Sequence, residues 1–226
     1  MEAVAYPGVL ITKSMDPGWL SNAYLVADEE GGTAVFVDSG APLEPLLESA
    51  REWGVEPSHV LRTHGHTDHV SGERELGLPV VTGPLEVGGL RIEALPTPGH
   101  ADDHLSYVVN GEAAFTGDVL FKDSVGGGDF GRIRSSVMDV LMALPDETRV
   151  LPGHTDETTI GRERAENPFV RVWSGEEAEG VEPVRVDGRD ATLIVWSPDY
   201  DGKGKAWLRF TGGEDAIVGG SRVERS

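Results

Sequence analysis

Seven residues that can bind a metal ion follow short apolar runs. If these residues bind metal together, the fold must bring the ends of those runs close to one another. Four of them lie in the segment His64-Gly65-His66-Thr67-Asp68-His69. The others each follow a run that ends in glycine: His100 after Gly99, Asp118 after Gly117 and His154 after Gly153. Glycine allows a sharp turn, and a strand end is a rigid platform for a side chain. We therefore expect these segments to converge at one edge of a layered fold.

The rest of the chain alternates strand-like and helix-like patterns. Runs typical of strands are 20–26, 33–37, 60–61, 79–81, 90–95, 105–109, 113–115 and 149–151. Apolar residues at helical spacing predict helices at 43–53, 70–76, 137–144 and 158–165, with Gly54 ending the first. The strands form two groups, each followed by helices. This order favours an α/β sandwich over a helical bundle or an all-β barrel.

The composition changes after Trp173. Residues 174–182 are polar and rich in glycine and glutamate, which predicts a linker. Beyond it, strand-like runs at 183–186, 192–196, 206–210 and 216–218 alternate with turn signals such as Asp187-Gly188. We predict a catalytic domain over 1–173 and a small β-rich C-terminal domain over 183–226, which is too short to hold a large core alone.

Composition excludes several kinds of protein. The sequence contains no cysteine, so it has no disulfide, no thiol nucleophile and no cysteine metal ligand. Its formal net charge of −20 repels phosphates and anionic lipid, so we expect neither nucleic acid nor a membrane as a partner. No stretch approaches the roughly 20 apolar residues of a membrane span, and we see no signal peptide. A cytoplasmic location is the resulting expectation.

The donor set suits two divalent ions, for which we expect zinc and consider iron or manganese as alternatives. The first ion would take His64, His66 and His100, the second would take Asp68, His69 and His154, and Asp118 would bridge them. Two such ions about 3.5–4 Å apart generate a bridging hydroxide near neutral pH and polarise a carbonyl, so no protein nucleophile is needed. We predict Asp68 and Asp118 as the catalytic carboxylates.

Other side chains near these segments allow two interpretations each. Asp38 ends a strand and could orient a ligating histidine or cap a turn. His104 could also support a ligand, or be a buried structural histidine. Lys122, Arg132 and Arg134 could hold a substrate carboxylate, or be solvated surface charges.

The ligand pattern resembles that of the metallo-β-lactamase superfamily. The match consists of His-x-His-x-Asp-His at 64–69 followed by His100, Asp118 and His154, and it covers about residues 9–172. The resemblance implies a four-layer αββα sandwich with the metal ions at one edge of its two sheets. In this chain the sandwich would carry the small C-terminal β appendage.

Within the superfamily, four segments resemble the glyoxalase II-like (hydroxyacylglutathione hydrolase-like) group: 97–100, 116–121, 151–154 and 159–169. The reaction that this resemblance implies is hydrolysis of a thioester to a carboxylate and a thiol. Glyoxalase II enzymes carry a helical C-terminal domain with basic contacts to glutathione, whereas the tail here is short and β-like. We therefore expect a small-molecule acyl-thiol or related ester as substrate, and leave the thiol open.

Three alternatives use the same residues differently. The chain also resembles mononuclear iron(II) persulfide dioxygenases, which would bind iron through His64, His100 and Asp118. A lactonase or phosphodiesterase would keep the two-metal site with a different pocket. A non-catalytic binding module would have lost a ligand, and none is lost here. The C-terminal β segment could serve dimerisation, so a homodimer is a further expectation.

Overall fold

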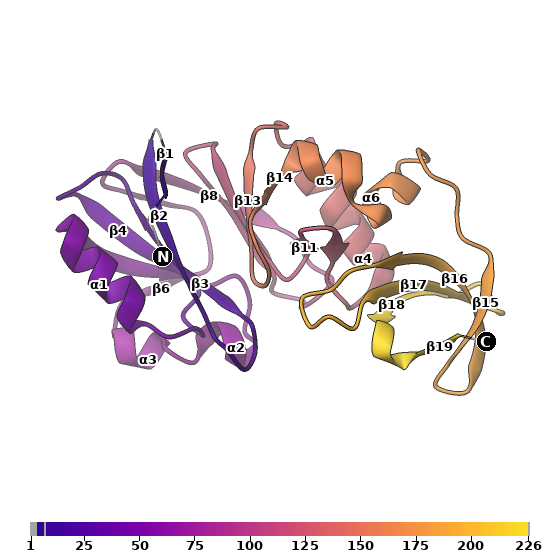
Figure 1. Cartoon of the computed structure of the whole chain (residues 1–226). Coiled ribbons are helices and arrows are strands. Elements are labelled where there is room, and N and C mark those ends of the chain that lie inside the picture. Colours follow the sequence, from indigo (N-terminus) through magenta and orange to yellow (C-terminus); the bar gives the residue numbers. More distant parts are fainter. Residues whose placement is uncertain (1–3, 7, 226) are drawn as a thin grey trace. The chain divides into compact units, whose positions relative to one another are not determined.

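The computed structural model describes residues 4–6 and 8–225, which divide into two compact units (Figure 1). The first unit contains the described residues up to Pro96, together with Asp103–Gly117 and Gly153–Thr155. The second contains Thr97–Asp102, Asp118–Pro152 and the chain from Asp156 onward. Each unit is described by itself.

The first unit begins with a six-stranded sheet in the order β1 to β6. Its strands are β1 (Val4–Tyr6), β2 (Val9–Met15), β3 (Asn22–Ala27), β4 (Thr33–Val37), β5 (Glu56–Leu61) and β6 (Val80–Val81). Neighbouring strands from β1 to β4 are antiparallel, whereas β4, β5 and β6 are parallel. The strands predicted from apolar runs at 20–26, 33–37, 60–61 and 79–81 are confirmed, with small shifts of their ends.

Helix α1 (Glu44–Trp53) connects the parallel strands β4 and β5. Its buried residues Leu46 and Ala50 join a core cluster with Leu25 and Phe36 of the sheet. The predicted stop at Gly54 is confirmed, because this glycine takes a left-handed conformation and its N–H donates to the last helical carbonyls.

The first unit also contains four strands of a second sheet, which are antiparallel neighbours in the order β10-β9-β8-β7. These are β7 (Leu85–Val87), β8 (Leu90–Pro96), β9 (Leu105–Val109) and β10 (Ala113–Gly117). Tyr107 of β9 joins the two sheets, because its hydroxyl lies 2.8 Å from the Arg62 carbonyl and 3.1 Å from that of Val81. Burial, with Asp38 nearby, raises the pKa of Tyr107 well above its ordinary value, so the hydroxyl stays protonated and donates.

The second unit combines short helices with a five-stranded antiparallel sheet in the order β18-β17-β16-β15-β19. Its first elements are β11 (Leu120–Phe121), β12 (Ser124–Val125), α4 (Phe130–Ser135), β13 (Arg149–Pro152), β14 (Thr158–Thr159), α5 (Ile160–Glu166) and α6 (Pro168–Trp173). The sheet strands are β15 (Glu182–Val186), β16 (Arg189–Ser197), β17 (Lys205–Phe210), β18 (Asp215–Gly219) and β19 (Val223–Arg225).

The five-stranded sheet shares its core with the helices of its own unit. Phe169, Val170 and Trp173 of α6 belong to one buried cluster with Ile194 and Trp207 of the sheet. The predicted strands at 183–186, 192–196, 206–210 and 216–218 are confirmed. The domain boundaries at 1–173, 174–182 and 183–226 remain a prediction.

Three predicted helices differ from the structure. The segment 70–76 is not one helix but two, α2 (Thr67–Val70) and α3 (Glu73–Leu76), because Gly72 between them donates to the Ser39 carbonyl and has no room for a side chain beside it. The helix expected at 137–144 instead begins at Phe130 and continues as π and 3-10 turns to Ala143. The helix at 158–165 begins only at Ile160, since Thr158 and Thr159 pair with β13. No helix in the described residues is both long and apolar enough to cross a membrane.

The hydroxyl of Tyr107 gives a test of how the two sheets of the first unit are held together. Tyr107→Phe keeps the ring and removes only the donor to two carbonyl groups. We expect the free energy of unfolding to fall by about 1–3 kcal/mol, measured by urea denaturation, because buried acceptors lose their partner. A loss below about 0.5 kcal/mol, the size of an ordinary surface substitution, would contradict this role.

Candidate metal centre

The predicted ligand segment 64–69 lies between β5 and the short helix α2. Strand β5 ends at Leu61, and His64 is buried just beyond it. His66 has extended backbone and stands at the N-cap of α2, so that Asp68 and His69 lie in the first turn of this helix. The segment thus places His64 and His66 in the connection after β5, and Asp68 and His69 in helix α2.

Asp68, His69 and His154 come together within the first unit. The Asp68 Oδ2 atom lies 3.6 Å from the His69 Nε2 atom and 3.6 Å from the His154 Nε2 atom. Ligand atoms around one tetrahedral zinc ion, each 2.0–2.1 Å from it, lie roughly 3.3 Å from one another. The three side chains therefore have the spacing of ligands to a common ion, and the donor set of one carboxylate and two imidazoles suits zinc, iron or manganese.

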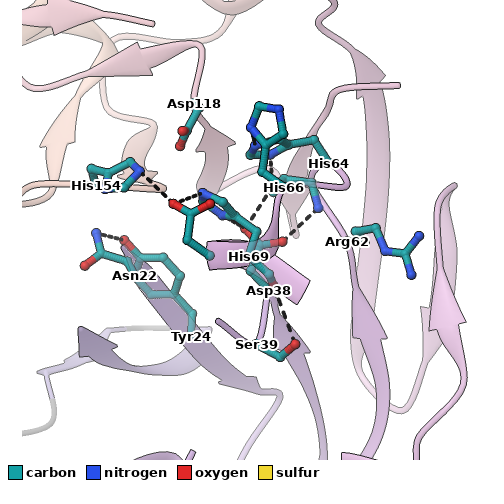
Figure 2. A network of polar contacts seen from close by, with 12 residues as sticks. Asn22, Tyr24, Asp38, Ser39, Arg62, His64, His66, His69, Asp118 and His154 are labelled. Carbon is teal, nitrogen blue, oxygen red and sulfur yellow. Dashed lines mark hydrogen bonds and ion pairs between the residues drawn. The ribbon is translucent and has the colours of Figure 1, made fainter. Parts of the chain in front are cut away.

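The ring orientation of both histidines is fixed through their other nitrogen. The His69 Nδ1 atom lies 2.8 Å from Asp38 Oδ2 (Figure 2). The His154 Nδ1 atom lies 2.9 Å from the Leu20 carbonyl oxygen. A carbonyl only accepts, so Nδ1 of His154 carries the proton. This arrangement leaves each Nε2 lone pair for a metal ion, as in metal sites where a carboxylate or carbonyl orients the ligand.

Asp38 makes three contacts from a single buried carboxylate. Besides His69, it accepts hydrogen bonds from the Thr63 N–H at 2.9 Å and from the Thr63 hydroxyl at 2.8 Å. Its backbone is left-handed, with a φ of 55°. Of the two interpretations of Asp38, these contacts support the orienting carboxylate, because a turn cap would not bond a ligand candidate.

His64 and His66 form a second pair in the same unit. The His64 Nε2 and His66 Nδ1 atoms are 3.0 Å apart (Figure 2). This spacing again suits two ligands of one ion. The ring of His104 lies 5.1 Å from that of His64, centre to centre, and packs against Gly117, the last residue of β10. His104 is thus buried beside a ligand candidate, and its supporting role stays a prediction.

The second unit brings His100 and Asp118 together. The His100 Nε2 atom lies 3.5 Å from Asp118 Oδ2, and the His100 Nδ1 atom lies 3.0 Å from the Gly127 carbonyl oxygen. The same logic therefore holds as for His154: a backbone carbonyl occupies one ring nitrogen and leaves the other for an ion. Gly127 was not recognisable from the sequence as a partner of His100, because a carbonyl group has no sequence signal.

The glycine-rich run after Asp118 explains how this pair is held. A Cβ atom on Gly126 would stand 1.8 Å from the Asp118 carbonyl oxygen, and one on Gly128 would stand 2.1 Å from the Gly99 carbonyl oxygen. Only glycine permits these approaches. Two of the three basic candidates for a substrate carboxylate have other surroundings: Arg132 pairs with Asp102, and Arg134 lines a cavity of the second unit.

Comparison with known proteins connects this geometry to a family. The sequence model of a protein family, described as "Metallo-beta-lactamase superfamily", matches residues 16–78, which include Asp38 and the segment 64–69. An uncharacterized protein of Aquifex aeolicus is 34% identical over 193 residues, an alignment that covers 66% of this chain and 90% of that protein. The chain belongs to the metallo-β-lactamase superfamily.

The chain is also similar to a curated hydrolase and to solved structures. The hydroxyacylglutathione hydrolase GloC of Haemophilus influenzae is 29% identical, with 68% of this chain and 94% of GloC covered. The crystal structure of ETHE1 from Myxococcus xanthus matches with a TM-score of 0.62 and 28% identity, covering 74% of this chain and 91% of that one. TTHA1623 in a di-iron-bound form matches with a TM-score of 0.57 and 32% identity, covering 69% and 98%.

The metallo-β-lactamase fold of mixed α/β class, predicted from the sequence, is confirmed by these comparisons. Together with the His/Asp clusters, they support a metal-dependent hydrolase of this superfamily. A di-iron neighbour and the ligand chemistry fit two ions without identifying the metal.

A substitution at Gly40 tests whether the candidate metal site depends on close packing of the backbone. A Cβ atom there would stand 1.6 Å from the Asp68 carbonyl oxygen, so Gly40→Ala must displace α2 with Asp68 and His69. We expect less bound metal by elemental analysis and about 1–3 kcal/mol lower stability. Gly83→Ala is the matched control, because an added Cβ meets no atom within 4 Å there. Equal metal content in both variants would refute the dependence.

A substitution at Asp38 tests whether its carboxylate orients the His69 ring for metal binding. Asp38→Asn keeps the shape of the side chain but removes the charge that faces the His69 Nδ1–H and lets an amide N–H point at it. We expect zinc affinity, measured by competition with a chelator, to fall by about 10–100-fold. Asp139→Asn makes the same charge change at an exposed position and should leave affinity unaltered. If Asp38→Asn bound zinc like the control, Asp38 would be only a structural turn residue.

Proposed function

We propose that the chain is a binuclear metal-dependent hydrolase that cleaves a thioester of a small acyl-thiol. The observation that carries the proposal is the shared spacing of Asp68, His69 and His154, whose donor atoms lie as ligands of one ion do. The proposed ligands are those expected from the sequence: His64, His66 and His100 for one ion, Asp68, His69 and His154 for the other, and Asp118 between them.

Chain connectivity supports the inclusion of His100 and Asp118. Asp118 directly follows Gly117, the end of β10, and consecutive Cα atoms are about 3.8 Å apart. His100 lies in the segment Thr97–Asp102, which leaves the first unit after β8 and returns to it at Asp103. Along the chain, both residues are therefore only a few positions away from strands of the first unit.

When bound, two divalent ions lower the pKa of water and polarise the carbonyl oxygen of a substrate. The residues of the chain then have positioning roles. Asp38 and the Leu20 carbonyl hold the rings of His69 and His154, and the Gly127 carbonyl holds that of His100. Because the chain has no cysteine, the proposal needs no thiol nucleophile.

A cavity in the first unit offers room for the substrate. It measures about 400 Å³ and is lined by Arg62, Thr63, His64, Thr82, Asp103 and Leu105. This volume lies within the range of small-molecule sites. We propose that part of the acyl-thiol occupies it, since His64 is both a lining residue and a ligand candidate.

The similarity to GloC supports a thioester as the bond that is cleaved, because that relative is named a hydroxyacylglutathione hydrolase. The thiol remains open. The C-terminal part of this chain is a five-stranded sheet and not the helical domain of glyoxalase II enzymes, so the contacts to glutathione that such a domain supplies have no counterpart.

The decisive experiment measures metal content and thioester hydrolysis on the same sample. Protein purified without added metal should contain about two ions per chain and hydrolyse members of a panel of S-acyl thiols, with activity lost on chelation and restored by metal. His154→Ala should lower both metal content and kcat, the latter at least about a hundredfold. His59→Ala is the matched control, because His59 contacts Ser58 outside the clusters. One ion per chain together with no thioester hydrolysis would rule the proposal out.

The similarity to ETHE1 favours a second candidate, an iron(II) persulfide dioxygenase that uses His64, His100 and Asp118. In that case the purified protein would hold one iron ion per chain. A persulfide would then yield sulfite with consumption of oxygen, whereas S-acyl thiols would not react. The two functions are thus separated by the same preparation.

A further inference from the structure

A cavity in the second unit has its own binding chemistry. It measures about 400 Å³ and is formed where α4, the end of α6, the segment before β15 and strands β17 and β18 meet. Its lining residues are Phe130, Arg134, Val172, Trp173, Glu179, Trp207, Arg209 and Asp215. None of these is a candidate metal ligand, and the volume is that of a small-molecule site.

Aromatic rings form one wall of this cavity. The ring centres of Phe130 and Trp207 are 5.1 Å apart, and Trp173 lies 6.1 Å from each of them. The ring planes are tilted by 38° to 73° to one another, so the cluster gives the cavity an uneven apolar side against which an aromatic ring of a ligand can pack. The indole N–H of Trp173 is buried and has no acceptor among the described residues, so an acceptor atom of a ligand would supply its missing partner.

Next to Trp207 the lining carries a network of charges that is already satisfied, with the Arg209 guanidinium 5.7 Å from the centre of the Trp207 ring. Arg209 pairs with Glu179, its Nη2 atom 3.0 Å from Oε1, and with Asp215, its Nε atom 3.0 Å from Oδ1. Trp207 also donates from its indole nitrogen to Asp215 at 2.8 Å. Hydrogen bonds to Glu179 and then to Asp215 raise the pKa of Arg209. Arg209, Glu179 and Asp215 therefore bind one another and leave little capacity for a ligand.

Arg134 is the exception in this lining. No described carboxylate lies within ion-pair distance of its guanidinium group, although the chain as a whole carries a net charge of −20. The two arginines and two acidic residues of the lining sum to zero charge, so an anion is not repelled locally as it is by the rest of the surface. An arginine without a partner beside aromatic rings favours a planar, negatively charged ligand.

We propose that this cavity binds a small aromatic carboxylate. The ring of the ligand packs on Phe130 and Trp207, and its carboxylate pairs with Arg134. The site is independent of the proposed hydrolase chemistry, because every residue it uses belongs to the second unit and none is a candidate metal ligand. Of the two sequence interpretations of Arg134, this is the carboxylate-binding one, at a place that the sequence did not indicate.

Isothermal titration of the full chain with phenylacetate, and with neutral phenylacetamide as the matched ligand, tests the proposal. We expect saturable binding of phenylacetate and at least about tenfold weaker binding of the amide, because a charge-assisted pair is lost. Arg134→Gln should weaken phenylacetate binding by about tenfold or more. Arg74→Gln removes the same charge from an exposed helix position of the first unit and should leave the affinity within about twofold.

Two further readouts locate the bound ligand. The indole N–H resonances of Trp173 and Trp207 should shift in proton–nitrogen correlation spectra during the titration. Binding should also persist after chelation of metal, because the cavity contains no candidate metal ligand. A carboxylate that was bound to a metal centre would instead be released by chelation. The proposal is overturned by no saturable binding up to about 10 mM, by unaltered affinity in Arg134→Gln, by loss of binding on chelation, or by indole resonances that do not move.

Discussion

The buried carboxylate of Asp38 connects the fold of the first unit to its candidate metal ligands. It stands at the end of β4, and it accepts hydrogen bonds from the backbone and hydroxyl of Thr63, which follows β5. Its remaining contact holds the ring of His69 in α2. One side chain therefore ties two parallel strands to the helix that carries two ligand candidates. Its left-handed backbone, with a φ of 55°, costs roughly 1–2 kcal/mol, and the three hydrogen bonds hold it in place.

The same principle governs the other imidazole rings. His154 and His100 each direct one nitrogen to a backbone carbonyl, from Leu20 and Gly127 respectively. A ring held in this way has one protonated nitrogen and one lone pair, so the hydrogen bond decides which atom can bind an ion. The fold thus prepares donor atoms through main-chain groups that any sequence could provide, and it does so in both units.

At two of the candidate ligands, glycines allow backbone segments to approach one another closely. Gly40 lies against the Asp68 carbonyl, and Gly126 lies against that of Asp118. Any side chain at these positions would occupy the space of the neighbouring backbone. Packing around the five-stranded sheet of the second unit relies on large side chains. Aromatic residues such as Trp207 and Trp173 fill the space between this sheet and the helices. The same cluster borders the cavity that contains Arg134.

The sequence by itself determined the α/β class, most strands, helix α1 with its stop at Gly54, and the list of candidate ligands. These follow from local patterns: apolar periodicity, turn residues and the spacing within 64–69. It did not determine the division of 70–76 into α2 and α3, the start of α4 at Phe130, or the carbonyl partners of His100 and His154. Only the tertiary structure decided the division of 70–76 and the two carbonyl partners, because each depends on a backbone group from a distant segment. The start of α4 depends instead on a local cap, in which the Asp129 carboxylate accepts from the Arg132 N–H. The apolar periodicity of a segment predicts which side of a helix or strand is buried. It does not predict which carbonyl group from elsewhere in the chain will form a hydrogen bond with that segment.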